Sequence, residues 1–368
     1  MRDVYFQGVG MVKCGRFNER IEINAARACI NALKDAGINW REVQAAYATH
    51  VMQGVSAGQK VVSQIGLTGL NVTNVENACA SGSTGIHHAY YDVASGKYDI
   101  VLVVGFEKMQ KGVIDSNSGE RSYEDKMGMR IMPGEYAMKA QRHMYEYGTT
   151  PEQMARVSVK NHKNGCYNPY AHYQKELTLE EVLHSRMISD PLTLLQACPT
   201  SDGAAAAILV SENVAKKNNN RDLIKLIGTS VQTESVFEEE DLTTRTANTA
   251  YEMANVGPED INLAEVHDAF TIGELLHYEA LGFCELGESG RLIDEGVTEI
   301  SGSLPVSPSG GLQSRGHPLG MTGIAQVCEI VWQLRGESKQ RQVRNNPKVG
   351  LTHTQGAGGV CSVSIISK

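Results

Sequence analysis

Two segments of the chain, one in each half, repeat the same strand, turn and helix pattern. In the first, a β-branched run leads into small residues around Cys79 and then into an apolar-periodic segment over 86–93. In the second, a small-residue turn that contains His317 leads into another apolar-periodic segment. Cys79 lies five residues before Thr84-Gly85-Ile86, and His317 lies five residues before Thr322-Gly323-Ile324. The spacing predicts a duplicated chain whose halves are related by a pseudo-twofold axis, which would bring the two helix N-termini together.

Strand-like and helix-like patterns alternate along both halves. Residues 4–12 and 100–105 are apolar runs of the kind that a sheet buries, and residues 21–36 form an amphipathic helical pattern. Residues 223–231 and 247–256 repeat the first strand and the first helix in the second half. This alternation predicts a layered α/β fold.

Cys79 is placed where a nucleophile could be made. A thiol at a helix N-terminus meets unpaired backbone N–H groups and the positive end of the helix dipole, which predicts a lowered pKa and a reactive thiolate. The surrounding small residues would let a substrate approach main-chain N–H groups, as an oxyanion hole requires. A buried structural cysteine is the alternative interpretation.

The composition excludes several classes of protein. Against 42 Asp and Glu the chain has 34 Lys and Arg, a net charge of −8, and it lacks the dense basic run that a nucleic acid would need. No apolar stretch reaches the ~18 residues of a membrane span, and residues 1–5 enter strand-like sequence without a signal peptide, which favours a cytoplasmic enzyme. The eight cysteines form no Cys-x-x-Cys pair, so we expect reduced thiols and neither a zinc site nor a disulfide framework.

Three motifs together carry a family resemblance. Asn77-Ala78-Cys79-Ala80-Ser81-Gly82, His267-Asp268-Ala269-Phe270 and Gly316-His317-Pro318-Leu319-Gly320-Met321-Thr322-Gly323 resemble the thiolase superfamily, in particular the sterol-carrier-protein type and its bacterial and archaeal relatives. The resemblance covers essentially the whole chain. It implies the α/β thiolase fold, with duplicated βαβαβαββ halves that form a layered α-β-α-β-α body.

The resemblance also implies a reaction and its residues. His317 would take the proton of Cys79, whose thiolate attacks the keto carbon of a 3-oxoacyl-CoA and leaves an acyl-Cys79. His267 and His317 would donate to the enolate oxygen, and Asp268 would fix the tautomer of His267 or anchor its loop. Coenzyme A would be a co-substrate, with no tightly bound cofactor and no metal.

Polar, irregular sequence interrupts the first half over about 107–189. Seven of the 13 methionines lie between Met109 and Met154. We expect an inserted loop domain that covers the active site, with methionines that contact an acyl chain or pantetheine arm or fill the core of a small helical subdomain. The predicted halves are 1–220, which contains this insertion, and 221–368.

Two further features are interpreted through the same family. Gly310 and Gly311 belong to a glycine-rich loop that could cradle a phosphate of CoA or pack near the substrate. His353 lies where many thiolases carry the cysteine of a Cys-x-Gly loop, and Ala269 stands where sterol-carrier-protein thiolases usually have another cysteine. Because both usual acid/base thiols are missing, we expect His353 to be the nearest candidate for that role, with His317, a water or the substrate's own carboxylate as alternatives.

The substrate and the assembly stay open at this point. The acyl group could be acetyl, long-chain or aromatic, as in benzoylsuccinyl-CoA thiolases. A ketosynthase-like condensing acyltransferase, an acetyl-CoA C-acetyltransferase subunit of a larger complex and an inactive structural subunit are the alternative functions. We expect a homodimer in which the strands over 71–75 of the two copies pair at the sheet edge. A small accessory protein with a zinc ribbon and an OB-fold is a possible further partner.

Overall fold

The computed structural model describes residues 1–368 apart from 111, 113–122, 128–130, 218–221 and 345. Its strands form a nine-stranded sheet in the order β3-β2-β4-β7-β1-β8-β11-β10-β9. The strands of the first half are β1 (Val4–Met11), β2 (Ala45–Thr49), β3 (Asn71–Val75), β4 (Ile100–Glu107) and β7 (Gly203–Ser211). Those of the second half are β8 (Ile224–Thr233), β9 (Leu263–Glu265), β10 (Val349–Gly356) and β11 (Val360–Ser367).

The pairing of these strands confirms the duplication. In the first half β1 pairs antiparallel with β7, β7 pairs antiparallel with β4, and β4 pairs parallel with β2. In the second half β8, β11, β10 and β9 repeat these three pairings in the same order. The halves join where β1 pairs antiparallel with β8 at Tyr5 and Phe6.

The edge of the second half differs from the edge of the first. Strand β3 pairs with β2 over five residues, whereas its counterpart in the second half is a single parallel bridge between Ala264 and Val306. Pro305 and Pro308 flank this bridge, and proline has no N–H to extend a ladder. The counterpart of β3 in the second half is therefore reduced to one bridge, and the chain continues toward His317.

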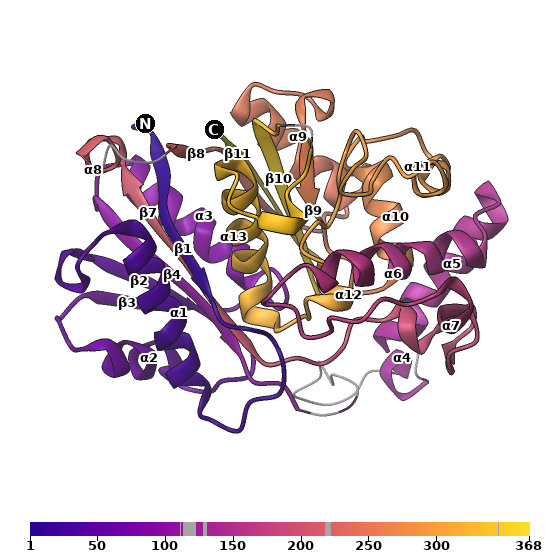
Figure 1. The fold of residues 1–368 in the computed structure, drawn as a ribbon, viewed down its shortest axis with the longest axis horizontal. Coiled ribbons are helices and arrows are strands. Elements are labelled where there is room, and N and C mark those ends of the chain that lie inside the picture. The colour runs from indigo at the N-terminus through magenta and orange to yellow at the C-terminus, as the bar shows by residue number, and fades with distance from the viewer. Residues whose placement is uncertain (111, 113–122, 128–130, 218–221, 345) are drawn as a thin grey trace.

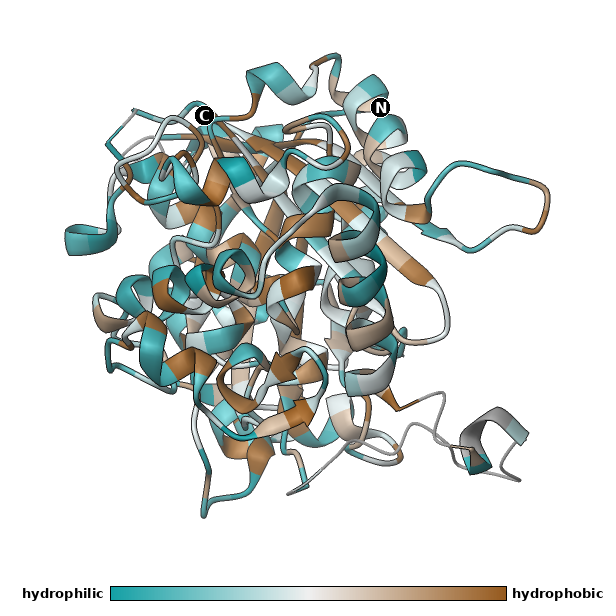
Figure 2. Ribbon diagram, turned by 90° about the vertical axis from the view of Figure 1, so that its right-hand side faces the viewer, coloured by the Kyte–Doolittle hydropathy of each residue, from teal (hydrophilic) through white to brown (hydrophobic). Residues whose placement is uncertain are grey.

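Helices cover the sheet in three layers, as expected for the thiolase fold (Figure 1). Helices α1 (Ile21–Ala36) and α2 (Ala57–Ile65) pack on the outer face of the first half, and α9 (Leu242–Ala254) packs on that of the second. Between the halves lie α3 (Ser81–Ala94) and α13 (Thr322–Arg335), which contact each other. Figure 2 shows hydrophobic segments mainly in the interior and hydrophilic residues along the outer helices.

Helix α13 shows why the middle layer is apolar. All of its residues except Trp332 and Arg335 are buried, because strands of both halves flank it. The side-chain NH2 group of its polar Gln326 donates to the carbonyls of Val266 and His353, at 3.1 and 3.0 Å. One helix of the second half thus links the segment that carries His267 to β10.

The insertion is helical and packs on the other half of the molecule. It contains α4 (Tyr123–Lys126), α5 (Met132–Tyr147), α6 (Pro151–Cys166), α7 (Leu179–Leu183) and the two-stranded sheet of β5 (Met187–Ser189) and β6 (Leu192–Thr193). Short helix α8 (Glu212–Lys217) follows β7. Helix α6 contacts α10 (Thr271–Ala280), α11 (Ser289–Asp294) and α12 (Gly311–Ser314) of the second half (Figure 1).

The methionines of the insertion have different surroundings. Met154 is fully buried in the core that the insertion shares with the second half, and Met109 lies in a small cluster with Cys79. Met127 and Met138 are exposed. Among the described helices, none is long and apolar enough to span a membrane.

Candidate active site

Cys79 lies in a tight turn two residues before the first residue of α3. Ala78 has a positive φ of 47°, a strained conformation for a residue with a side chain. The turn is held by local hydrogen bonds. The Asn77 N–H donates to Ser81 Oγ at 2.8 Å, the Ser81 hydroxyl donates to the Ala78 carbonyl at 2.6 Å, and the Ala78 N–H donates to Glu76 Oε1 at 2.7 Å. These contacts fix the direction in which the thiol leaves the backbone.

His317 occupies the matching turn before α13. Its Nδ1 lies 2.8 Å from Thr322 Oγ1, and the Thr322 hydroxyl donates to the Pro318 carbonyl at 2.9 Å. Because that hydroxyl has one proton, it must accept from His317 Nδ1–H. The neutral ring therefore carries its proton on Nδ1. The lone pair of Nε2, which has no hydrogen-bond partner among the described residues, can accept a proton.

The duplication extends to individual hydrogen bonds. Thr84 in α3 corresponds to Thr322, and its hydroxyl likewise donates four residues back, to the Ala80 carbonyl at 2.9 Å. In the first half this threonine accepts from the Asn77 side chain at 3.0 Å instead of from a histidine. The same local arrangement thus holds the turn of Cys79 in one half and the ring of His317 in the other.

The structure brings Cys79, His267 and His317 together. One side-chain atom of each, the sulfur or a ring nitrogen, lies within 4.8 Å of the other two, and all three residues are buried. The rings of His267 and His317 meet edge to face with centroids 5.0 Å apart. The expected meeting of the two helix starts is therefore observed.

Glycines make this approach possible. A Cβ on Gly323 would lie 2.0 Å from Ser83 Oγ and 2.6 Å from the Ser83 nitrogen. A Cβ on Gly82 would lie 3.1 Å from the Gly320 carbonyl oxygen. Any side chain at Gly323 would push the two helix starts apart.

His267 lies two residues beyond β9, and the ring of His353 contacts its backbone. The His267 N–H donates to His353 Nδ1 at 3.4 Å, while His353 Nε2 faces Thr243 Oγ1 at 3.4 Å. His353 is fully buried within β10, which extends to Gly356, whereas we expected it in a loop. The strand continues because all of 349–356 pairs with β11.

This position does not favour the proton-carrier role expected for His353. Both of its ring nitrogens face groups of the chain itself, and its ring packs against His277, with centroids 4.2 Å apart, rather than against the Cys79 cluster. His353 therefore supports the backbone of His267.

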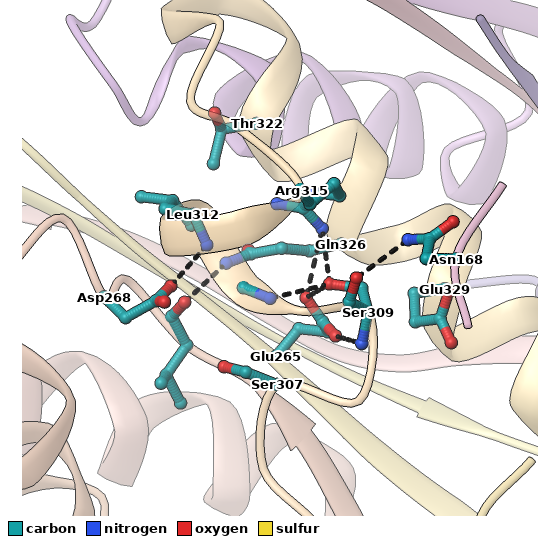
Figure 3. A network of polar contacts seen from close by, with 12 residues as sticks. Asn168, Glu265, Asp268, Ser307, Ser309, Leu312, Arg315, Thr322, Gln326 and Glu329 are labelled. Carbon is teal, nitrogen blue, oxygen red and sulfur yellow. Dashed lines mark hydrogen bonds and ion pairs between the residues drawn. The ribbon is translucent and has the colours of Figure 1, made fainter. Parts of the chain in front are cut away.

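A buried polar network anchors the loop that leads to His317 (Figure 3). Glu265 accepts from the Ser309 N–H at 2.9 Å and from the Ser309 hydroxyl at 2.7 Å, and it forms an ion pair with Arg315 at 3.0 Å. Asp268 accepts from the N–H groups of Leu312 at 2.7 Å and Gln313 at 3.3 Å. Of the two roles expected for Asp268, the contacts favour anchoring of the loop.

The same network accounts for Gly310 and Gly311. A Cβ on Gly311 would lie 2.2 Å from an Asp268 oxygen, and a Cβ on Gly310 would lie 2.8 Å from the Gly165 Cα in α6. Both glycines have positive φ and are buried. Because the neighbouring amides already bind carboxylates of the chain, the contacts favour packing rather than a phosphate cradle.

Burial sets the protonation states at the site. Burial raises the pKa of the Cys79 thiol to about 12, and a backbone hydrogen bond from Ala357 offsets only part of this effect. Burial lowers the pKa of His267 to about 3 and holds the pKa of His317 well below 6.5. The lowered thiol pKa predicted from the helix terminus is wrong for the resting structure, because desolvation outweighs the dipole.

Several contacts around Cys79 were not anticipated from the sequence. Met109, Leu319 and the partly buried Val51 form an apolar cluster with it. Tyr136 of α5 stacks on Phe270 with centroids 4.7 Å apart, and the Cys79 thiol helps to raise its pKa. A Cβ on Gly356 would lie 2.6 Å from the Asn77 carbonyl, so the β10–β11 turn packs against the turn of the thiol. The glycine-rich sequence around Gly356 is typical of a tight turn. Asn77, which this turn contacts, lies far away in the sequence, so no local pattern could indicate the contact.

The arrangement can do two kinds of chemistry. A neutral thiol beside two neutral imidazoles can pass its proton to a ring nitrogen as it attacks an electrophilic carbon. One sulfur and two nitrogens at these separations could also bind a metal ion of the softer kind. The fold and this site define a class of protein in which a cysteine at one helix start lies beside a histidine at the other.

The comparisons with known proteins identify the family. The profile of the thiolase N-terminal domain matches residues 13–213, and a profile described as thiolase C-terminal domain-like matches residues 228–368. The chain therefore belongs to the thiolase family, and it is an acyltransferase of that family.

Curated relatives match along their length. The chain is 42% identical to the acetyl-CoA acetyltransferase of Methanothermobacter thermautotrophicus, with all of both chains covered. It is 38% identical to the benzoylsuccinyl-CoA thiolase subunit BbsB of Thauera aromatica, over 97% of this chain and 95% of the relative. It is 39% identical to sterol carrier protein 2 of Rattus norvegicus, over 98% of this chain and 71% of the relative.

Solved structures agree on the fold. The Ltp2-ChsH2(DUF35) aldolase superposes with a TM-score of 0.88 at 26% identity, over 99% of this chain and 97% of that one. Human mitochondrial 3-ketoacyl-CoA thiolase superposes with a TM-score of 0.75 at 19% identity, over 100% and 99%. The latter likeness shows the fold alone.

Proposed function

We propose that this thiolase works through an acyl-Cys79 intermediate on the CoA thioester of a 3-oxo acid. The observation that carries the proposal is the meeting of the Cys79 thiol with His267 and His317 in a buried site. His317 accepts the thiol proton on Nε2 because Thr322 holds the proton of the neutral ring on Nδ1. The thiolate then attacks the keto carbon, and the carbon–carbon bond breaks to give acyl-Cys79 and an enolate.

His267 and His317 serve the enolate side. His267 can donate from its neutral ring, and His317 can donate from Nε2 once it holds the thiol proton. Water is largely excluded from this buried site, where such donors have their largest effect. The Ala357 N–H, which already approaches the sulfur, is suited to the tetrahedral intermediate on Cys79. Free CoA then resolves the acyl-enzyme as a co-substrate.

The acyl group is expected to be apolar. Met109 and Leu319 line the sulfur, and the stacked Tyr136 and Phe270 lie on the insertion side. One relative is a benzoylsuccinyl-CoA thiolase subunit and another is an acetyl-CoA acetyltransferase. These names support both an aromatic acyl group and an acetyl group as candidates.

Acylation measured by intact-protein mass spectrometry tests this function. Wild-type protein mixed with acetyl-CoA, octanoyl-CoA or benzoyl-CoA should gain the mass of one acyl group, and Cys79→Ala should gain none. The alanine variant should keep the unfolding midpoint of the wild type to within a few degrees, because it removes one small side-chain atom. Carbon–carbon cleavage by Cys79→Ala within tenfold of wild type would contradict the proposal.

The assembly proposed for this thiolase is a homodimer. Strand β3 lies at one end of the sheet, and most of its residues are exposed or half-buried, which leaves an edge open for a second copy. Leu67 and Val55, in the loops on either side of α2, are more than 80% exposed next to this edge. A monomer by light scattering at micromolar concentration would refute the dimer.

An accessory protein is also proposed. The relative BbsB is described as a subunit, and the aldolase structure names a DUF35 component beside its thiolase-fold chain. We expect a small zinc-ribbon and OB-fold protein to bind this chain. Co-purification from the native source, with identification of the second polypeptide and of zinc, tests this expectation.

A further inference from the structure

The segment over 196–198 runs directly beside the motif that carries His267. The Cys198 N–H donates to the Ala269 carbonyl at 2.8 Å, and Ala197 pairs with Phe270 in an antiparallel bridge. The Gln313 side-chain amide donates to the Asp268 carbonyl at 2.7 Å and to the Gln196 carbonyl at 3.4 Å, so it clamps the two segments together. Cys198 is thus fixed next to Ala269.

The thiol of Cys198 lies within electrostatic range of the Cys79 site. Burial does most to raise the pKa of the Tyr136 phenol, and Cys79 and Cys198 both add to it. Burial also does most to raise the pKa of Cys198, followed by Asp268 and then Cys79. Cys198 packs against the cluster that contains Tyr136, Ala269 and Phe270, yet it keeps some exposure where Ala269 and Phe270 are buried. Cys198 is therefore less buried than the two residues of the motif beside it.

Other thiols among the described residues have different surroundings. Cys14 contacts Met321 Sδ at 4.0 Å, Cys328 approaches the Gly10 carbonyl at 3.9 Å, and Cys361 approaches Thr243 Oγ1 at 3.9 Å. These three are buried in the core.

We propose that Cys198 is the proton carrier at the enolate carbon, supplying from the neighbouring segment the thiol that Ala269 lacks. This inference rests on the proposed function. After the carbon–carbon bond breaks, the Cys198 S–H bond breaks and its proton forms the new C–H bond of the enolate, which leaves a Cys198 thiolate. The incoming CoA thiol returns a proton to Cys198 and attacks acyl-Cys79. The departing Cys79 thiolate recovers its own proton from His317, so every proton is accounted for.

The step has a readout that is independent of acyl transfer. In deuterium oxide, the wild-type enzyme should exchange the α-protons of acetyl-CoA for deuterium. Mass spectrometry measures the resulting gain in mass of acetyl-CoA. Cys198→Ala should slow this exchange at least 100-fold while acylation of Cys79 by acetyl-CoA stays within threefold of wild type. Cys29→Ala is the matched control, since Cys29 is a fully buried thiol of α1 on the outer face of the first half, and its loss should leave exchange unchanged.

A rescue variant separates chemistry from packing. The double variant Cys198→Ala/Ala269→Cys moves the thiol from residue 198 to residue 269, its hydrogen-bonded neighbour. This variant should restore exchange to within tenfold of wild type. Should Cys198→Ala fold poorly, Cys198→Ser keeps the volume and the hydrogen bonding but replaces the thiol by a weaker acid, and it should show the same loss.

Three results would overturn the assignment. They are exchange by Cys198→Ala within threefold of wild type, an equal loss of exchange and of acylation, and loss of exchange in His353→Ala with Cys198→Ala unaffected. Failure of the proposed function would look different, because wild-type Cys79 would then not be acylated at all.

Discussion

At the scale of single residues, the site depends on hydrogen bonds that decide which atom carries a proton. Thr322→Val would remove the acceptor for His317 Nδ1–H while keeping the shape of the side chain. The unpaired N–H would cost about 1–3 kcal/mol and free the ring to turn or change tautomer. We expect kcat to fall about 10- to 100-fold with little change in KM. Thr322→Ser, which keeps the hydroxyl, should stay within threefold of wild type, and equal activity of the two variants would contradict the tautomer argument.

His353 offers a second test at this scale. Since its ring accepts from the His267 N–H, His353→Asn, which places an amide oxygen near the same atom, should keep more activity than His353→Ala. A proton carrier would lose activity equally in both variants, because an amide does not titrate. The measurement is the ratio of the two kcat values for carbon–carbon cleavage, which we expect to exceed ten.

At the scale of elements, the contact between α3 and α13 sets the distance between Cys79 and His317. Gly323→Ala would place a Cβ 2.6 Å from the Ser83 nitrogen, which cannot move without moving α3. In an open helix this change would be favourable by about 0.5–1 kcal/mol, but overpacking here costs about 1–3 kcal/mol and the net effect is destabilising. Activity should fall more than tenfold as the helix starts separate.

A glycine outside this contact provides the control. A Cβ on Gly15 would meet no atom within 4 Å, and the backbone of Gly15 has no positive φ, so Gly15→Ala should leave the unfolding midpoint and activity unchanged. Chemical denaturation of the two variants gives the comparison. A Gly323→Ala protein as stable and active as wild type would show that the close approach of the helices is not needed.

At the scale of the whole molecule, buried histidines make the fold sensitive to acid. Burial lowers the pKa of His87 to about 4, of His267 and His353 to about 3, and of His277 and His317 well below 6.5. In the unfolded chain, each of these histidines binds a proton below about pH 6.5. The unfolded state then holds protons that the folded state lacks, so the free energy of unfolding decreases as the pH is lowered. Each group contributes up to about 1.4 kcal/mol per pH unit in this window.

Buried carboxyls act in the opposite direction, but they are fewer. Burial raises the pKa of Asp268 and of Glu265 to about 7, so these groups favour the folded state as the pH falls through that range. We therefore expect the urea midpoint to decrease from pH 7 to pH 5, with a smaller decrease in His87→Gln, whose ring lies outside the site. A urea midpoint that does not change over this range would contradict the expectation that the buried histidines outweigh the buried carboxyls.

By itself, the sequence determined the duplication and the family. A five-residue spacing and the order of three motifs are local facts, and amphipathic periodicity places α1 and α3 because burial of one face follows from spacing alone. The same reasoning named Cys79, His267 and His317, which the structure brings together.

Only the tertiary structure decided what surrounds these residues. The thiol pKa rises because both halves bury it, His353 turns away because β10 continues into a hairpin, and the amides near Gly311 are bound by carboxylates from distant segments. Cys198 gains its place from a backbone hydrogen bond to Ala269, which joins the segment after the insertion to the second half. Such effects depend on desolvation and on contacts between segments far apart in the chain, and a local pattern contains neither.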